Sequence, residues 1–160
     1  MRQLLQNDMK KNNWNCKCIR CREVKDFKVN AKDIKLDIQE YNASSGIEYF
    51  ISFETEKYLI GFIRLRLNNG NENKETQQPI LNGCALIREL HVYSNLNDVG
   101  NNIDNSYQHK GYGKKLIEVA ENIAIKEGYS KMAIISGTGV RNYYRKIGYE
   151  LIDTYMIKKL

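Results

Sequence analysis

The sequence predicts an α+β domain built on a mixed, mostly antiparallel sheet, in which one strand–helix–strand crossover carries a glycine-rich turn. Two patterns support this fold class. Apolar and polar residues alternate through much of the first half of the chain, which is typical of half-buried strands. In the second half an amphipathic helix lies between two apolar strands, and residues 108–114, which read QHKGYGK, open that helix.

The bulk properties are those of one globular domain. A chain of 160 residues is long enough for a single hydrophobic core, and its 42% hydrophobic and 28% charged residues are ordinary for such a domain. No apolar run reaches the length of a membrane span, and residues 1–6 lack the apolar region of a signal peptide. We therefore expect a cytoplasmic protein with no membrane partner.

The first half of the chain predicts a leader followed by strands. Residues 1–15 are polar and show no periodicity, so we expect a polar leader there and the folded domain over residues 16–160. A short strand is expected around residues 19–24. Between residues 34 and 38, isoleucine and leucine alternate with charged and polar residues, which indicates a half-buried strand.

A hairpin and a central strand should follow. Residues 49–53 and 58–67 alternate with period two across a short polar connection, as in a β-hairpin. Residues 85–92 form an apolar run that suits a central strand. Two Asn-rich stretches, 68–82 and 94–107, flank this strand and are expected to be surface loops.

The last third of the chain predicts the crossover. Apolar residues recur at helical spacing after Gly113, and Gly128 marks the helix end. The apolar strand at 132–135 should then run parallel to the 85–92 strand, because strand–helix–strand units return in parallel. A short helix over 140–147 and a last strand over 149–158 complete the expected fold.

The glycine-rich turn has the chemistry of an anion site. Glycines at the mouth of a helix let the backbone approach a ligand closely, so that N–H groups point outward with the positive end of the helix dipole behind them. Lys110, Lys114 and Lys115 add mobile positive charge at the same place. A pyrophosphate group would suit this turn. The alternative is a tight loop whose glycines serve only the turn itself.

The chain is basic, with a formal net charge of +6. An anionic partner, either a nucleic acid or a nucleotide cofactor, would match this charge, although solubility alone also accounts for it. The basic residues form an N-terminal group and a smaller C-terminal group. These are Lys10, Lys11, Lys17, Arg20, Arg22, Lys25 and Lys28, and then Arg141, Arg145 and Lys146.

Three cysteines, Cys16, Cys18 and Cys21, have the C-x-C-x-x-C spacing of a metal thiolate cluster. They supply three ligands, so a tetrahedral zinc ion would need a fourth. Cys84, a histidine or a segment of a partner could provide it. The alternative is three reduced thiols on a loop.

The ordered motifs of this chain resemble those of the GNAT acetyltransferase superfamily. Within it, they are most similar to the C-terminal acetyltransferase-like domain of the catalytic (third) subunits of Elongator. Five motifs carry the resemblance, which covers about residues 16 to 160. They are CKCIRCRE from Cys16, FIRLRL from Phe62, RELHVY from Arg88, QHKGYG from Gln108 and SGTGVRNYYRKIGY from Ser136.

The resemblance implies that acetyl-CoA is the acyl donor, bound where a parallel strand pair splays apart. In the family, the backbone of the first of these strands pairs with the pantetheine arm; here its residues are Glu89, Leu90, His91 and Val92. The pyrophosphate loop corresponds to Gln108, His109, Lys110, Gly111, Tyr112, Gly113 and Lys114. Tyr143 and Tyr144, on the short helix, match the positions that contact the cofactor.

Two side chains are candidates for proton transfer. The hydroxyl of Tyr144 near the sulfur could protonate a departing thiolate, and His91 could act as a catalytic base. Each has a structural alternative, because a histidine between apolar neighbours can be a satisfied core residue. Tyr143 and Tyr144 can likewise be core aromatics with a polar tip.

The resemblance implies a function linked to tRNA wobble-uridine modification, in which tRNA binding stimulates acetyl-CoA turnover. The full Elongator subunit also carries a radical S-adenosylmethionine domain, for which residues 1–15 leave no room. We therefore expect an excised domain or a shortened homologue that works with a separate radical SAM or Elongator-type subunit. The segment between Ile38 and Tyr49 is too short for the two helices that shape the acceptor site in many GNAT enzymes. A free-standing N-acetyltransferase for a protein lysine or small amine, and a non-catalytic tRNA-binding module, are the alternatives.

Overall fold

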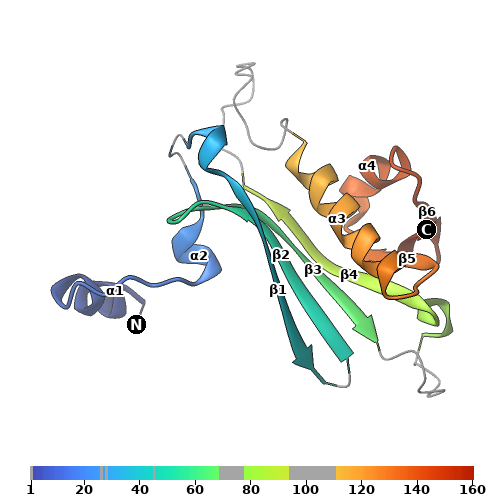
Figure 1. Cartoon of the computed structure of the whole chain (residues 1–160), viewed down its shortest axis with the longest axis horizontal. Coiled ribbons are helices and arrows are strands. Elements are labelled where there is room, and N and C mark those ends of the chain that lie inside the picture. Colours follow the sequence, from blue (N-terminus) through green and yellow to red (C-terminus); the bar gives the residue numbers. More distant parts are fainter. Residues whose placement is uncertain (1, 26, 28, 45, 69–77, 94–110) are drawn as a thin grey trace.

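The computed structural model describes residues 2–25, 27, 29–44, 46–68, 78–93 and 111–160. Its centre is a seven-stranded sheet with the order β1-β2-β3-β4-β5-β7-β6 (Figure 1). The strands are β1 Lys35–Ala43, β2 Gly46–Glu54, β3 Leu59–Asn68, β4 Cys84–Val92, β5 Lys131–Ile135, β6 Glu150–Ile152 and β7 Tyr155–Lys159. This is the mixed sheet that the sequence predicts.

The sheet is antiparallel except at one pair of neighbours. β1, β2, β3 and β4 form an antiparallel meander, and β5, β7 and β6 are also joined antiparallel. Between these halves β4 and β5 run parallel, as the strand–helix–strand rule predicts. A tight turn joins β1 to β2, with Ala43 pairing with Gly46, so no helices intervene there.

The crossover helix α3, Tyr112–Lys126, packs on one face of the sheet, over β2, β3 and β4 (Figure 1). Its buried side chains recur at helical spacing, which explains why this segment is an amphipathic helix. Gly128 follows its end with φ +85°, the left-handed conformation in which glycine has no Cβ penalty. The main core lies between α3 and the sheet and includes Ile51, Ile63, Leu65, Ile87, Leu116 and Met132.

The remaining helices are short. They are α1 Arg2–Lys11, α2 Ile19–Arg22 and α4 Arg141–Arg145, with 3₁₀ turns at Ala31–Asp33, Pro79–Leu81 and Thr138–Val140. α2 lies on the sheet face opposite α3, where Ile19 packs against Phe50 and Phe62. Among the described residues, no helix is long and apolar enough to cross a membrane.

Two sequence-based expectations about secondary structure were wrong. Residues 19–22 form helix α2 rather than a strand, and only Glu23 makes a bridge, to Leu59. The cause is local, because the N–H groups of Cys21 and Arg22 both donate to the carbonyl of Cys18. The expected last strand is instead the hairpin of β6 and β7, and Asp153 takes φ +55° at its turn, which aspartate tolerates well.

Two further segments differ in environment from the expectation. β1 was expected to be half-buried, yet Leu36 and Ile38 remain 43% and 45% exposed, because β1 is an edge strand that α3 does not cover. The expected leader contains helix α1, whose described side chains are exposed apart from the partly buried Met9. A domain boundary at residue 15 stays a prediction. Most of the two Asn-rich loops lies outside the described residues.

Candidate active site

The two parallel strands β4 and β5 are paired over only the first part of β4. They pair from Cys84 with Lys131 to Ile87 with Ile134, and the pairing then ends. At that point β4 carries a bulge, because Arg64 and Leu65 of β3 face Glu89 and Ile87, which leaves Arg88 as the extra residue. From Arg88 to His91, β3 is the only strand beside β4 in the described sheet. The β5-facing edge of this segment can therefore accept an extended ligand.

The bulge also decides which face each β4 side chain occupies. Ile87 and Leu90 both join the core beneath α3. Glu89 and His91 project to the opposite face, where Glu89 pairs with Arg64 at 3.3 Å and His91 stacks on Phe62. Period-two alternation without a bulge would have put Ile87 and Leu90 on opposite faces.

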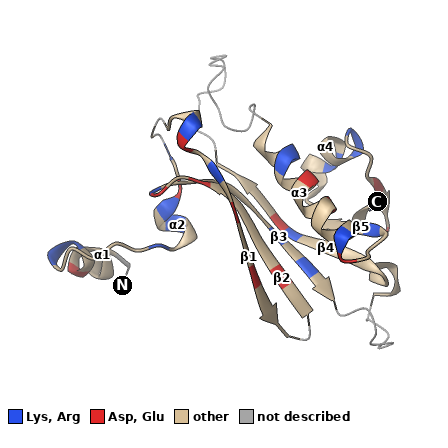
Figure 2. Cartoon of the chain, viewed as in Figure 1, with Lys and Arg blue, Asp and Glu red and all other residues tan. Residues whose placement is uncertain are grey.

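The start of α3 is anchored beside the end of β4. Gly111 caps the helix with φ +75°, a left-handed conformation that disfavours any residue with a Cβ. The ring of Tyr112 is buried against Phe53, with ring centroids 5.0 Å apart. This side chain holds the helix mouth in place, so only the backbone of Tyr112 is a candidate for contact with a phosphate. Lys114 and Lys115 give the first turn positive charge (Figure 2).

The structure brings three of the sequence-predicted cofactor residues together. A Cβ built on Gly113 would lie 3.2 Å from the Tyr143 hydroxyl and 3.6 Å from Cγ2 of Val92. The end of β4, the mouth of α3 and the short helix α4 therefore converge at Gly113. The first part of the predicted pyrophosphate loop, Gln108, His109 and Lys110, lies outside the described residues.

Tyr143 and Tyr144 are adjacent on α4 but differ in environment. Tyr144 is 6% exposed in the main core, with its ring 5.2 Å from Tyr143 and 6.1 Å from Tyr149. Burial, and next the neighbouring Tyr143, raise the pKa of Tyr144 to about 12. Tyr143 is 39% exposed, and burial followed by the charge of Glu118 raises its pKa too. Both hydroxyls are protonated at neutral pH, so either can donate a proton but neither is a base.

His91 lies on the face of the sheet opposite α3. Its ring is exposed, stacked 6.1 Å from Phe62 and tilted 4.6 Å from Tyr93. An exposed ring held between two aromatic neighbours is accessible to a substrate. A role as catalytic base is compatible with this position and stays a prediction.

Sequence reasoning missed Ser136 as a candidate cofactor contact. Its hydroxyl follows β5 directly, is buried, and has no hydrogen-bond partner within the described part of the chain. Because β4 and β5 are parallel, Ser136 and the free segment of β4 lie at the same edge of the sheet. A buried hydroxyl without a partner is costly, so a ligand that bonds it would be favoured. The signal in the sequence is that Ser136 opens the motif SGTGVRNYYRKIGY.

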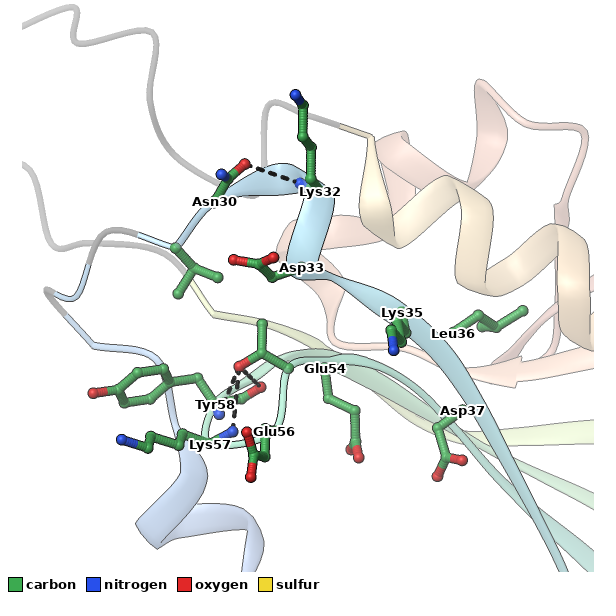
Figure 3. A pocket seen from close by; sticks show the side chains of 12 residues that line it. Asn30, Lys32, Asp33, Lys35, Leu36, Asp37, Glu54, Glu56, Lys57 and Tyr58 are labelled. Carbon is green, nitrogen blue, oxygen red and sulfur yellow. Dashed lines mark hydrogen bonds between the residues drawn. The ribbon is translucent and has the colours of Figure 1, made fainter.

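One well-formed cavity lies away from this strand gap. It measures about 810 Å³ and lies between the 3₁₀ turn Ala31–Asp33, β1 and the β2–β3 turn (Figure 3). Three lysines and four carboxylates line it, and no residue of β4, α3 or α4 does. The convergence of strand gap, helix mouth and tyrosine pair is a stronger indication of chemistry than the size of a cavity, so we do not place the active site here.

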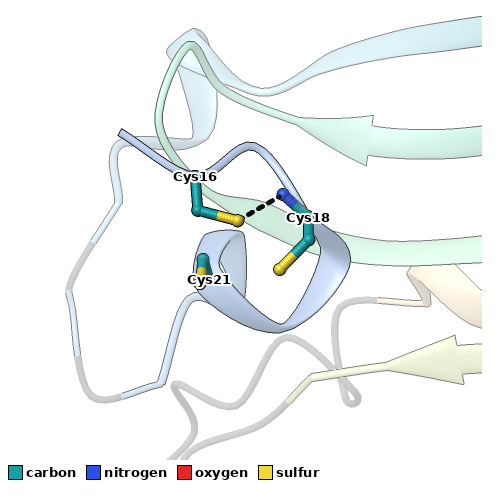
Figure 4. Close-up of side chains that lie close together, drawn as sticks. All are labelled: Cys16, Cys18 and Cys21. Carbon is teal, nitrogen blue, oxygen red and sulfur yellow. Dashed lines mark hydrogen bonds between the residues drawn. The ribbon is translucent and has the colours of Figure 1, made fainter. Parts of the chain in front are cut away.

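The three N-terminal cysteines do come together. α2 folds Cys16, Cys18 and Cys21 so that their sulfur atoms lie within 4.8 Å of one another (Figure 4). The Cys18 N–H donates to the Cys16 sulfur at 3.5 Å. Hydrogen bonds, first from the Cys16 side chain and then from the Cys21 backbone, lower the pKa of Cys18 to about 7. Three close thiols suit zinc, which prefers thiolate ligands.

Cys84 is not the fourth ligand. It is 2% exposed in a separate cluster with Ala133 and Ile157, and its thiol donates to the carbonyl of Ile80 at 3.6 Å. Burial, offset in part by Lys131, raises the pKa of this thiol. No other His, Cys, Asp or Glu joins the three sulfurs among the residues that the structure describes.

Fold and site together define an acetyltransferase of the GNAT type, with a splayed parallel strand pair beside a helix that begins at a glycine-rich turn. Residues 13–149 match the acetyltransferase (GNAT) family. The chain belongs to this family, and acetyl-CoA is its acyl donor.

Three known proteins show which members of the family the chain is similar to. The chain is 42% identical to the tRNA uridine(34) acetyltransferase of Methanocaldococcus jannaschii, a match that covers 99% of this chain and 30% of the relative. It is 40% identical to Elongator complex protein 3 of Danio rerio, over 100% of this chain and 30% of that protein. The structure of an N-terminally shortened Elp3 from Methanocaldococcus infernus superposes with a TM-score of 0.82 at 40% identity, covering 99% of this chain and 38% of that one. The chain thus spans about 30% of the length of the two full-length relatives, from Methanocaldococcus jannaschii and Danio rerio.

Proposed function

We propose that this chain is the acetyl-CoA-dependent acyltransferase unit of a tRNA uridine-modifying system, and that tRNA stimulates its turnover of acetyl-CoA. The observation that carries the proposal is the convergence at Gly113, where Val92 at the end of β4, the mouth of α3 and Tyr143 meet. The identity of more than 40% to a tRNA uridine(34) acetyltransferase supports the tRNA part. The cytosol, where such a system would work, is part of the same proposal.

Acetyl-CoA would lie along the strand gap. The amides of its pantetheine arm match the unpartnered edge of β4 from Arg88 to His91, because an extended amide chain can add to a strand edge. Its pyrophosphate would then reach the mouth of α3, near Gly111 and Lys114, where the helix dipole and the lysine favour an anion. The Ser136 hydroxyl can accept or donate one further hydrogen bond from its edge of the gap.

The reaction requires one nucleophile and one proton donor. A nucleophile of the acceptor attacks the thioester carbonyl, the carbonyl oxygen gains negative charge, and a strand N–H of β4 stabilises it. Collapse breaks the carbon–sulfur bond and leaves a thiolate, which takes a proton from a tyrosine hydroxyl on α4. The proton that the acceptor nucleophile loses then returns the tyrosine to its neutral form. Tyr144 is the donor that the family motif favours. Both tyrosines hold their protons at neutral pH.

The tight β1–β2 turn supports a large acceptor over a small amine. Without helices between these strands, the described residues form no enclosing wall at that side of the sheet. A tRNA, or a second protein carrying one, could approach such an open face. A separate radical SAM or Elongator-type subunit would supply the remaining chemistry of uridine modification.

The test is to measure acetyl-CoA binding by calorimetry and CoA release by thiol titration, with and without tRNA. We expect binding by the wild type, and CoA release that rises when tRNA is added. Gly111→Glu should abolish both, because it adds a charged side chain at a φ of +75° beside the phosphate site. A wild-type chain that binds no acetyl-CoA overturns the proposal. Turnover with amine acceptors in the absence of RNA would favour a free-standing N-acetyltransferase.

A further inference from the structure

A second cavity of about 560 Å³ lies on the sheet face opposite α3, between α2 and strands β1, β2 and β3. We call it the α2 groove. Four cationic side chains and two aromatic rings line it: Lys17, Arg20, Arg22 and Arg64, and Tyr41 and Phe50. Its volume is within the range of about 300–1,000 Å³ that ligand sites occupy.

The α2 groove carries surplus positive charge. No carboxylate lines it. Two of its four cations form ion pairs with carboxylates outside the lining. Arg22 pairs with Glu54 at 2.7 Å, and Arg64 pairs with Glu89 at 3.3 Å. Lys17 and Arg20 are exposed and have no ion pair with any described carboxylate, so their charges face solvent. Uncompensated cations beside a groove favour an anionic ligand.

The two rings of the groove are held in place before any ligand binds. Phe50 stacks on Phe62 at 5.2 Å, and the Arg64 guanidinium carbon lies 6.0 Å from the centre of its ring. Tyr41 is 41% exposed, and its hydroxyl donates to Glu48 at 3.1 Å. Glu48 in turn is fixed by Arg66 at 3.2 Å. A ring that is exposed yet anchored offers a stacking surface at low entropic cost.

The groove is connected to the active site across the same face of the sheet. Phe50, Phe62 and His91 form a continuous row from β2 to β4, with ring separations of 5.2 Å and 6.1 Å. His91 belongs to the free segment of β4 that would hold acetyl-CoA. A ligand in the α2 groove therefore lies on the face from which an acceptor can approach the thioester.

We propose that the α2 groove binds a single-stranded segment of RNA, with phosphates at Lys17 and Arg20 and a base stacked on Tyr41. This rests on the proposed function in so far as the RNA is the tRNA acceptor. Cations that track a backbone, combined with an exposed aromatic ring, are the features by which proteins hold unpaired nucleotides. An acidic peptide would use the cations but has no planar base for the ring, so the pairing of the two favours RNA.

The experiment measures binding of a fluorescent single-stranded oligoribonucleotide by anisotropy at several salt concentrations. We expect Lys17→Ala/Arg20→Ala to weaken binding about tenfold and to lower the slope of log K against log salt by about 1.4, because each phosphate contact contributes roughly 0.7 for a single strand. The matched control Lys126→Ala/Lys131→Ala removes the same charge from the end of α3 and the start of β5. It should leave both quantities unchanged.

A second pair of variants tests the ring. Tyr41→Ala should weaken RNA binding severalfold, whereas Tyr41→Phe, which keeps the ring and loses only the bond to Glu48, should retain it. Photo-crosslinking with 4-thiouridine RNA should label peptides that contain Tyr41 or residues 17–22. Three outcomes would each overturn the proposal. The two double variants could lose RNA affinity equally, or the crosslinks could be confined to other surfaces. An acidic peptide could also displace the RNA while both double variants bind RNA as tightly as the wild type.

Acetyl-CoA binding by the same variants separates this inference from the proposed function. We expect the groove variants to bind acetyl-CoA like the wild type, because no residue of the groove lies at the strand gap or the mouth of α3. If the wild type binds RNA in the groove but no acetyl-CoA, the proposed function fails and the groove assignment stands. If acetyl-CoA binds and the groove variants keep full RNA affinity, the groove assignment fails and the proposed function stands.

Discussion

The hydroxyl of Tyr143 on α4 sits against Gly113 on α3, so closely that a methyl group on Gly113 would be 3.2 Å from it. Neither residue is near the other in sequence, and the contact joins the two halves of the candidate active site. Gly113 does not have a left-handed φ, so its backbone conformation does not require glycine. Its lack of a side chain instead leaves room for neighbouring groups. The space it leaves lies between Val92 and Tyr143.

This relationship predicts opposite effects of Gly113→Ala on stability and on ligand binding. Alanine favours a helix over glycine by roughly 1 kcal/mol, so the free energy of unfolding should fall little or even rise. The added methyl group must push the Tyr143 hydroxyl aside, so we expect acetyl-CoA affinity to drop about tenfold. Calorimetry and urea unfolding of the same samples measure the two quantities.

Two companion variants make the Gly113 result decisive. Gly139→Ala adds a methyl group with nothing within 4 Å, and it should leave acetyl-CoA affinity unchanged. Tyr143→Phe removes the atom that the new methyl group meets, so it should restore part of the affinity lost by Gly113→Ala. An affinity for acetyl-CoA that is unaffected by Gly113→Ala would show that this contact is outside the cofactor site.

Ser136→Ala should separate cofactor binding from folding in another way. The Ser136 hydroxyl is buried and without a partner among the described residues, so its removal should cost the folded chain less than about 0.5 kcal/mol. If acetyl-CoA supplies the missing partner, its affinity should fall about five- to tenfold, the equivalent of one hydrogen bond of about 1 kcal/mol. A large loss of stability with unchanged affinity would contradict this role.

The parts of the fold that the sequence predicts are those with strong periodicity. α3 and the central strand β4 carry regular patterns, and both form close to the expected residues. α2 was mistaken for a strand because it is a single turn of four residues, too short for any period. The β6–β7 hairpin was read as one strand, because an Asp153 with positive φ interrupts a segment with no glycine at the turn.

The candidate site was predictable in its residues but not in its geometry. The glycines and tyrosines could be chosen from the motifs, whereas the bulge at Arg88 has no signal in the sequence. Because of that bulge, His91 faces the groove side of the sheet and not α3. Contacts such as Tyr143 with Gly113 depend on how α4 packs, which is a property of the tertiary fold.

Among the described acidic residues on the sheet face opposite α3, Glu48 should be the one whose replacement lowers the free energy of unfolding most. It is 5% exposed and accepts hydrogen bonds from Arg66, Arg88 and Tyr41. Burial alone would raise its pKa, but these bonds, with Arg66 first, outweigh burial and hold the pKa below the usual glutamate value. Glu48→Gln leaves two guanidinium groups without their partner and should cost about 2 kcal/mol at neutral pH, reduced from the value for a fully buried pair because Arg88 is half exposed.

The stability lost by Glu48→Gln should depend on pH in a defined direction. A carboxyl with a lowered folded pKa stabilises the protein above its unfolded pKa, and that contribution disappears as the pH falls through the folded value. The difference between wild type and Glu48→Gln should therefore be full at pH 6 and shrink from pH 5 to pH 3. Urea unfolding across this range measures it. Glu118→Gln, whose partner Lys114 is 3.9 Å away on the surface, should change stability by less than about 0.5 kcal/mol.

Metal removal should act locally on α2. Three sulfurs within 4.8 Å of one another should bind one zinc ion per chain. Chelation should raise amide exchange in residues 16–22 and leave the sheet protected, because Cys16, Cys18 and Cys21 belong to no strand. Cys84→Ser should retain the zinc, and Cys18→Ser should lose it. Metal content by elemental analysis that is below one tenth per chain after growth in zinc would contradict the assignment.

Tyr144 should make the protein sensitive to alkaline pH. An unfolded tyrosine ionises near pH 10, whereas the folded Tyr144 has a pKa of about 12. Its contribution to stability is complete below pH 10 and is lost as the pH rises through 12, at up to about 1.4 kcal/mol per pH unit. Tyr144→Phe should flatten the alkaline fall in unfolding free energy. Some slope should persist, because the pKa of Tyr49 is also raised to about 12, mainly by burial.

The variant Tyr144→Phe also tests which of the two tyrosines donates the proton in the reaction. If Tyr144 protonates the thiolate, Tyr144→Phe should lower turnover of acetyl-CoA about 10²-fold and leave its binding within twofold, because general acid catalysis contributes at least that much. Tyr143→Phe then serves as the control and should keep most of the turnover. Tyr143 is more exposed and its hydroxyl lies beside Gly113, so the opposite pattern would assign the donor to Tyr143. Because both pKa values are raised, neither tyrosine should produce a fall in rate below pH 9, and a titration near neutral pH would point instead to another group.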